Sequence, residues 1–102
     1  MYLLREDMFN ECANENGYTD IICLSNNAKT IEKELQEILD DYKTRNYIIE
    51  FYRDDETLLK QIERIKDKGT SAVYIDIYET ENDYDNGKNM ATLVVSHHKI
   101  KE

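Results

Sequence analysis

Carboxylates gather between residues 76 and 85, a stretch that contains no Lys or Arg. In an extended segment, residues two positions apart point to the same side. Four of these carboxylates would therefore form a single negative row, which we call the 79–85 row: Glu79, Glu81, Asp83 and Asp85. Asp76 precedes the row, and Tyr78 and Tyr84 offer the amphipathic rings that interface centres favour. Such a row would bind a cationic partner.

The 79–85 row is too sparse to imitate a nucleic acid alone. Carboxylates on alternate strand residues lie about 6.6 Å apart, whereas a DNA strand carries one charge per roughly 3.4 Å. Several acidic segments would have to combine with the row, among them residues 50–56. Residues three and seven positions apart lie along one side of a helix, so a helix over 28–44 would carry an acidic flank of Glu34, Glu37 and Asp41.

Other side chains with catalytic or metal-binding chemistry do not form a specific motif. His97 and His98 are adjacent, and consecutive strand residues point to opposite faces, so they cannot share one metal ion. Cys23, His97 and Asp76 have the residue types of a nucleophilic triad, but chance gives such combinations in any chain of this composition. We predict no catalytic residue, no metal and no cofactor, and expect a protein that is not an enzyme. A hydrolase or nuclease that holds magnesium with clustered Asp and Glu is an alternative.

The balance of charge restricts the partner. The chain has 22 acidic and 13 basic residues and a formal net charge of -9. Binding to a phosphate backbone draws its affinity from Lys and Arg that release counterions, so this balance argues against direct contact with nucleic acid. The same balance favours a basic protein surface as the partner, although an acidic surface also serves solubility alone.

Length and hydropathy indicate one small domain that spans residues 1–102. A chain of this size buries roughly 60 to 65% of the surface that its unfolded form exposes. The sequence has no run of about 18 apolar residues that would cross a membrane, and its first residues lack the basic flank and apolar stretch of a secretory signal. We expect a cytoplasmic protein that does not bind membranes, with Cys12 and Cys23 reduced.

Two helices are indicated by apolar residues at helical spacing. The apolar positions of the first, predicted over 28–44, are Ile31, Leu35, Ile38, Leu39 and Tyr42. Those of the second, predicted over 56–68, are Leu58, Leu59, Ile62 and Ile65. Capping side chains at 25–27 precede the first helix, and Gly69 follows the second. A basic ridge recurs every four residues along the second helix, either facing the acidic segments or lying in solvent: Lys60, Arg64 and Lys68.

Apolar runs and alternation predict four to five strands. Residues 19–25 read as a buried strand, and residues 72–78 and 91–98 as the two strands of a C-terminal β-hairpin within 71–99. Residues 47–52 are either a strand or the end of a long helix, and residues 2–4 either open a strand or belong to a helix that reaches residue 12. We favour a strand for both segments and expect a turn at 14–17.

The register of the hairpin depends on its turn. A two-residue turn at Asn86-Gly87 would mix the apolar and polar faces of the two strands. One extra residue would instead pair Ile77 with Val95 and keep a continuous apolar face. We therefore expect a bulge or an irregular tip within 79–90.

Together these patterns predict an α+β fold, with a mostly antiparallel sheet packed against the helices 28–44 and 56–68. In size, charge and mixture of helix and strand, the chain is similar to small acidic phage or mobile-element proteins such as anti-CRISPR and antirestriction inhibitors. This likeness implies an inhibitor that presses a carboxylate-rich surface onto the basic nucleic-acid groove of a larger protein. The alternative is a structural or regulatory module that self-associates through the 90–98 strand, for example as a homodimer.

Overall fold

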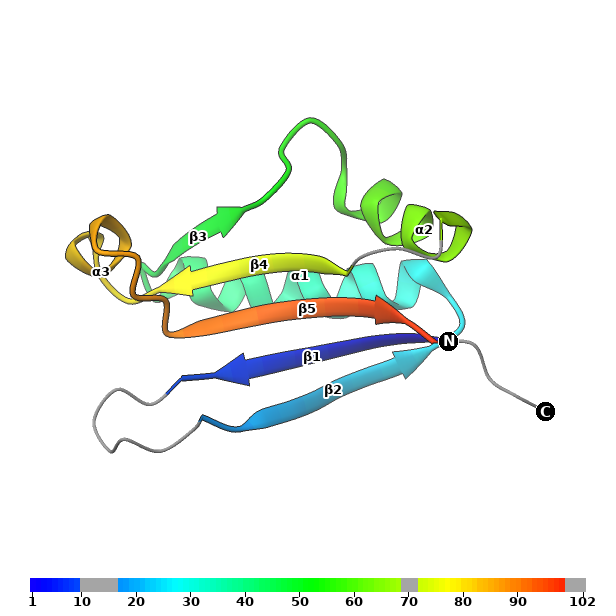
Figure 1. The fold of residues 1–102 in the computed structure, drawn as a ribbon, viewed down its shortest axis with the longest axis horizontal. Helices are drawn as coiled ribbons and strands as arrows, with labels where there is room; N and C mark the ends of the chain where they lie inside the picture. The colour runs from blue at the N-terminus through cyan, green and yellow to red at the C-terminus, as the bar shows by residue number, and fades with distance from the viewer. Residues whose placement is uncertain (10–16, 69–71, 99–102) are drawn as a thin grey trace.

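The computed structural model describes residues 1–9, 17–68 and 72–98 (Figure 1). They form an α+β fold whose five-stranded antiparallel sheet has the order β2-β1-β5-β4-β3, as the sequence analysis predicted. The strands are β1 (Tyr2–Met8), β2 (Thr19–Ser25), β3 (Ile48–Phe51), β4 (Val73–Tyr78) and β5 (Ala91–His97). The helices are α1 (Ala28–Thr44), α2 (Leu58–Lys68) and the short α3 (Glu81–Asp85).

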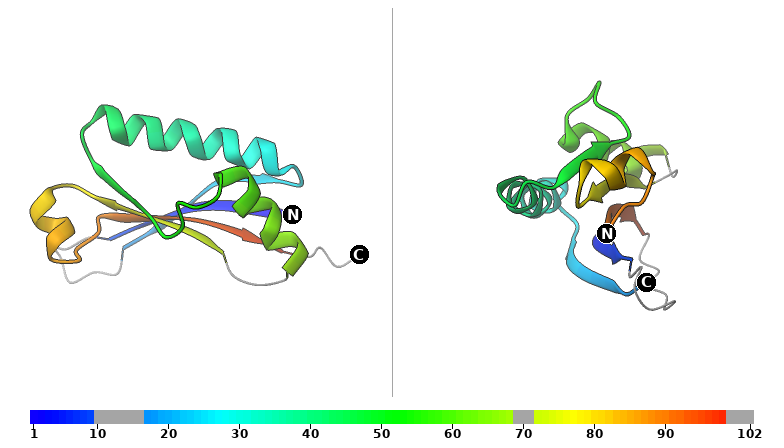
Figure 2. Two further views of the ribbon diagram at one scale, coloured as in Figure 1. Left: turned by 90° about the horizontal axis from the view of Figure 1, so that it is seen from above. Right: turned by 90° about the vertical axis from the view of Figure 1, so that its left-hand side faces the viewer.

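The hydrophobic core lies between the sheet and the two longer helices. Figure 2 shows α1 running along one side of the sheet, and the buried residues of α1 and α2 belong to the same cluster. The helices contribute Ile31, Leu35, Leu39, Tyr42, Ile62 and Ile65. The strands contribute Tyr2, Leu4, Val73, Ile75, Ile77, Ala91, Leu93 and Val95. Because these strand residues alternate with others, this cluster lies on one face of the sheet. Val94 and Tyr78, on the other face, are also buried.

Local hydrogen bonds define both ends of α1. Asn27 caps the first turn, because its Oδ1 accepts the backbone N–H of Lys29 at 2.9 Å. At the other end, Asn46 adopts a left-handed conformation with φ of 64°, and the Tyr47 N–H donates to the Tyr42 carbonyl at 3.0 Å. This arrangement closes a helix and redirects the chain. It separates α1 from β3, so the strand interpretation of residues 47–52 is confirmed.

The tip that joins β4 to β5 is irregular, as expected, and it contains α3. The Thr80 hydroxyl accepts the Asp83 N–H at 3.1 Å and caps the helix. Gly87 has φ of 68°, and the Lys88 N–H donates to the Asp83 carbonyl at 2.8 Å. Gly87 therefore ends a helix, where a residue without Cβ is favoured, and does not form a hairpin turn.

The predicted pairing of Ile77 with Val95 is wrong. Ile77 pairs with Ala91, and Val95 pairs with Val73. The strands diverge before the tip because α3 occupies residues that a tight turn would have paired. The apolar faces still match, because the observed and predicted registers differ by an even number of residues.

The position of β5 contradicts the predicted self-association through the 90–98 strand. β5 pairs with β1 on one side and with β4 on the other, so it is the central strand. The edges of the sheet are β2 and β3. The strand at 19–25 is therefore present but not buried as predicted, because an edge strand is covered less and leaves Ile21 and Leu24 exposed. Residues 2–8 form a strand and not the alternative helix. Cys12 and residues 14–16 of the expected turn lie outside the described residues, and Cys23 is a free, half-buried thiol.

Truncation of α1 tests the placement of the core. Leu35 is 0% exposed and Leu24 is 57% exposed. Leu35→Ala should reduce the free energy of unfolding by about 2 to 5 kcal/mol through lost burial and a residual cavity. The matched Leu24→Ala should change it by less than about 0.5 kcal/mol. Urea denaturation measures both, and equal losses would contradict the assigned core.

Substitution of Gly87 tests the cap of α3. A Cβ added at Gly87 would meet no atom within 4 Å, so any cost comes from the left-handed backbone. Gly87→Ala should lower the free energy of unfolding by about 1 to 2 kcal/mol, and Gly87→Asn by less, because Asn tolerates this conformation better. Thermal unfolding of the two variants measures the difference. Full stability of Gly87→Ala would reject the left-handed cap.

Candidate binding surface

The 79–85 row does not form the extended stripe that alternation predicted. The chain bends at Glu79 and Thr80 and then enters α3. Residues two apart on a helix differ by about 200° in direction, so Asp83 points away from the side shared by Glu81 and Asp85. Acidic residues in a first turn also stabilise the helix itself. The Thr80–Asp83 spacing is that of a capping box, a signal that the sequence analysis did not use and that would have indicated a helix here.

Asp76 is a buried hydrogen-bond acceptor. The residue is 7% exposed, and its carboxylate accepts hydrogen bonds from the hydroxyls of Thr92 and Tyr52, each at 2.8 Å. The Asn89 amide donates to it at 3.3 Å. Asp76 thereby joins β4 to β5, to the residue after β3 and to the end of the tip. It holds the sheet together and is not on the surface with the rest of the predicted site.

Tyr78 and Tyr84 meet each other. Their rings pack edge to face with centroids 5.1 Å apart, and Tyr78 is 6% exposed whereas Tyr84 is 43% exposed. Burial raises the pKa of Tyr78 above its ordinary value. A hydrogen bond to Glu50 raises the pKa of Tyr84. The pair therefore fastens α3 to β3 and β4, and only Tyr84 offers surface to a partner.

The acidic flank of α1 borders a groove between α1 and the β1–β2 pair, which we call the acidic groove. Its volume is about 370 Å³. It is lined by Glu6, Ile22, Glu34, Glu37, Ile38, Asp41, Tyr42 and Arg45. All three flank residues that the sequence analysis singled out are thus brought together. Glu6 was missed, although the alternation of Tyr2 and Leu4 in β1 places it on the same face.

Two of the four carboxylates in the acidic groove have partners. The Tyr42 hydroxyl donates to Glu6 Oε2 at 2.7 Å. Burial is the largest cause that raises the pKa of Tyr42 well above its ordinary value, and this hydrogen bond is the second. Arg45 Nη2 pairs with Asp41 Oδ2 at 2.7 Å, and its guanidinium lies 5.0 Å from the centroid of the Tyr42 ring. The residues that line the acidic groove therefore include four carboxylates and a single guanidinium.

Glu34 and Glu37 make no ion pair with any residue that the structure describes. Arg64, from the basic ridge of α2, has a different partner. It pairs with Glu56, which Arg53 also contacts at 3.3 Å. The acidic groove therefore keeps an uncompensated negative charge beside the apolar side chains of Ile22 and Ile38.

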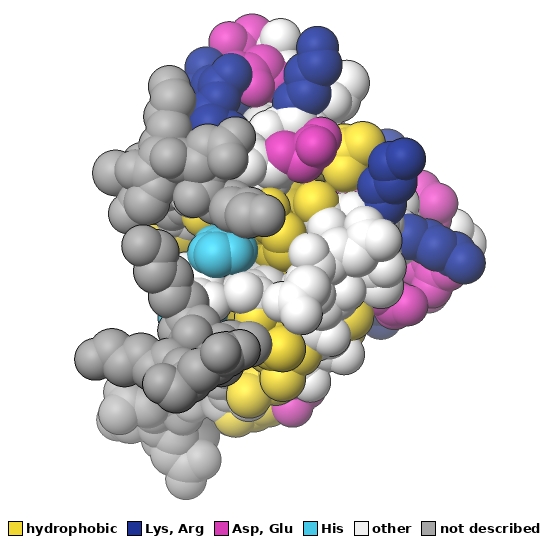
Figure 3. Space-filling model, turned by 90° about the vertical axis from the view of Figure 1, so that its right-hand side faces the viewer, with side chains coloured by type: hydrophobic (Ala, Val, Ile, Leu, Met, Phe, Trp, Pro, Cys, Tyr) yellow, Lys and Arg dark blue, Asp and Glu magenta, His cyan; other side chains and the backbone are white. Residues whose placement is uncertain are grey.

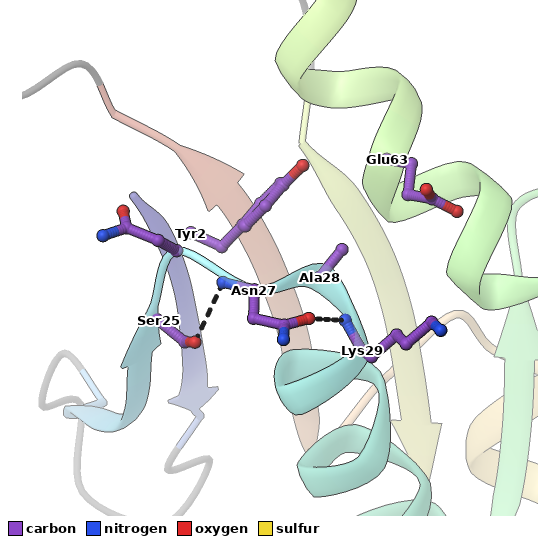
Figure 4. A pocket seen from close by; sticks show the side chains of 7 residues that line it. Tyr2, Ser25, Asn27, Ala28, Lys29 and Glu63 are labelled. Carbon is purple, nitrogen blue, oxygen red and sulfur yellow. Dashed lines mark hydrogen bonds between the residues drawn. The ribbon is translucent and has the colours of Figure 1, made fainter.

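The opposite end of the molecule has no single sign of charge. Figure 3 faces this end, where α1 begins, and shows Lys and Arg beside carboxylates and hydrophobic side chains. A pocket of about 680 Å³ opens there between the start of α1 and α2. Lys29 and Glu63 line it together with Tyr2 and Ser25 (Figure 4). The acidic groove is therefore the better candidate for a charge-selective site.

Comparison with known proteins identifies no relative. No family model, no curated protein and no solved structure matches the chain. Among the described residues, no His, Cys, Asp or Glu side chains form a group of three that could hold a metal ion. None of the described helices is long and apolar enough to cross a membrane.

The Tyr52–Asp76 bond predicts a titration in alkali. This bond is the largest cause that raises the pKa of Tyr52 from 10.0 to about 12. The folded chain thus holds a proton that the unfolded chain releases, and the free energy of unfolding should fall as pH rises from about 10 to about 12. Tyr52→Phe should remove part of this fall.

Ultraviolet absorbance of tyrosinate in the folded protein measures the same group. Asp76→Asn should move one late-titrating tyrosine back towards pH 10.0, the ordinary value. Tyr18→Phe, at a tyrosine that is 62% exposed, serves as the control for the removal of one hydroxyl elsewhere. An unchanged late titration in Tyr52→Phe would contradict the assignment.

Proposed function

We propose that this chain is a non-catalytic binding protein whose acidic groove occupies the basic nucleic-acid-binding surface of a larger protein and blocks it. The observation that carries the proposal is the pair Glu34 and Glu37, two carboxylates on one flank of α1 without an ion pair among the described residues. Uncompensated charge steers an oppositely charged partner and disfavours a partner of like charge.

The chemistry of the acidic groove suits Lys and Arg side chains. Their aliphatic stems lie favourably on apolar surface while their charged groups seek water or a carboxylate. Ile22 and Ile38 offer such a surface, and Glu34, Glu37 and Asp41 surround it. A protein surface that binds the phosphates of a nucleic acid carries many Lys and Arg side chains. Occupancy of that surface would exclude nucleic acid without any chemical step.

The class that we propose is the anti-defence inhibitor of phage or mobile-element type, such as an anti-CRISPR protein, acting in the cytoplasm. Its support is the small acidic α+β fold together with the acidic groove. The free thiol of Cys23 agrees with a reducing compartment.

Charge removal in the acidic groove tests the proposal. The immobilised chain should retain a nucleic-acid-binding protein from a nuclease-treated extract, and the retained protein should lose its binding to nucleic acid when the free chain is added. The variant with both Glu34→Gln and Glu37→Gln should inhibit about threefold to tenfold less well, given ordinary surface-pair energies. High salt should weaken the inhibition by the original chain.

A second double variant controls for net charge. Glu81→Gln with Asp85→Asn removes the same two charges from α3, outside the acidic groove. It should inhibit as well as the original chain. Equal weakening by the two double variants would reject the acidic groove as the contact, and a retained protein that still binds nucleic acid normally would reject the inhibitory function.

A further inference from the structure

The free edge of β2 lies beside the acidic groove. β2 pairs with β1 on one side, and no described segment pairs with its other side. It is seven residues long, against four for β3 at the opposite edge. Natural proteins commonly protect an edge strand by short length, by Pro or by charged side chains. β2 has a single charged residue, Asp20, and a bulge at Ile22 where it meets β1.

Three of the exposed side chains of β2 are hydrophobic: Ile21, Ile22 and Leu24. Ile21 is 66% exposed and Leu24 is 57% exposed. They lie opposite Arg5 and Leu3 of β1, on the sheet face that α1 does not cover. Ile22 is 37% exposed and faces α1 in the acidic groove. The edge therefore separates two environments: an apolar one formed by Ile21 and Leu24, and an acidic one formed by the flank of α1.

We propose that the partner adds an extended segment to the free edge of β2, with basic side chains on alternate residues and apolar side chains between them. Alternate residues of a strand point to opposite faces. One set would lie beneath Glu34 and Glu37, where a Lys or Arg finds an unpaired carboxylate. The other set would lie beside Ile21 and Leu24. Backbone hydrogen bonds to β2 supply affinity in this mode of recognition, and the two side-chain sets supply specificity.

A second copy of the chain is a poor occupant of the same edge. Pairing of β2 with β2 would bring two acidic flanks together, each with Glu34, Glu37 and Asp41. Each copy has a formal net charge of -9, and like charges placed opposite each other destabilise an interface. Charge complementarity therefore favours a basic segment of a different protein. This inference rests on the proposed function, since it names the part of the partner that the acidic groove receives.

The test uses a synthetic peptide and nuclear magnetic resonance of the isotopically labelled chain. The peptide matches the seven residues of β2 and alternates Lys with Val, with both ends capped. Its addition should shift the amide signals of β2 and slow the hydrogen exchange of amides on the free edge. Signals of β3, the other edge strand, should not change. Shifts confined to α3 or to β3 would overturn the inference.

Two control peptides separate strand addition from charge attraction. One carries N-methyl groups on alternate residues, so it keeps its charges but lacks donors towards β2, and it should bind about tenfold or more weakly. The other replaces each Lys with Glu and should not bind. If the methylated and unmethylated peptides bind equally well, backbone pairing with β2 is not needed and strand addition is overturned. The proposed inhibition through the charge of the acidic groove would not be affected by that result. A second contrary result is that the Lys–Val peptide fails to bind while the chain still inhibits the retained protein. That result would reject strand addition to β2 but not the proposed function.

Variants of the chain complete the test. Ile21→Lys puts a positive charge on the exposed edge of β2, where it should disturb folding little. It should weaken binding of the Lys–Val peptide. The control variant Tyr74→Lys, on β4, should leave that binding unchanged. Circular dichroism checks that both variants fold. Light scattering of the peptide-free chain measures its mass in solution. A dimer that Ile21→Lys dissociates would show that the edge takes a second copy and would overturn the proposed basic segment.

Discussion

Burial of the apolar face of α1 determines the direction of its carboxylates. Ile31, Leu35 and Leu39 are each at most 1% exposed, so α1 cannot rotate on the sheet without exposing them, and each such side chain contributes roughly 1.5 to 3 kcal/mol when buried. With that face fixed, Glu34, Glu37 and Asp41 must lie along the flank beside β1 and β2. The charge of the acidic groove is thus a consequence of the same packing that stabilises the fold.

The acidic residues of this chain serve different purposes according to position. Asp76 is an internal acceptor between strands, Glu56 receives Arg53 and Arg64, and Asp83 lies in the first turn of a capped helix. These groups are accounted for by structure. Glu34 and Glu37 have no such role among the described residues, and they line the acidic groove, whereas no residue of α3 does. For this reason the proposed contact lies on α1 and not on α3.

The sequence predicted the regular elements well because their signals are local. The helix over 28–44 and the strand over 19–25 have the observed bounds, since a capping triplet and a continuous apolar run mark them. The tip was mispredicted because Asn86-Gly87 is equally suited to a hairpin turn and to a helix end. The capping box at Thr80 would have distinguished the two.

The site was predictable only in part. Helical spacing placed Glu34, Glu37 and Asp41 together, but only the strand order brings Glu6 and Ile22 beside them. The burial of Asp76 depends on Tyr52, Asn89 and Thr92, which converge from three separate segments. Alternation along one strand contains no information about such long-range partners, nor about β5 being central.

A structure of the chain bound to its partner would test the account most directly. It should show an extended segment of the partner beside β2, with Lys or Arg nitrogens within about 4 Å of the carboxylates of Glu34 and Glu37. A partner seated on α3, or on the sheet face opposite α1, with these two carboxylates left in solvent, would contradict it.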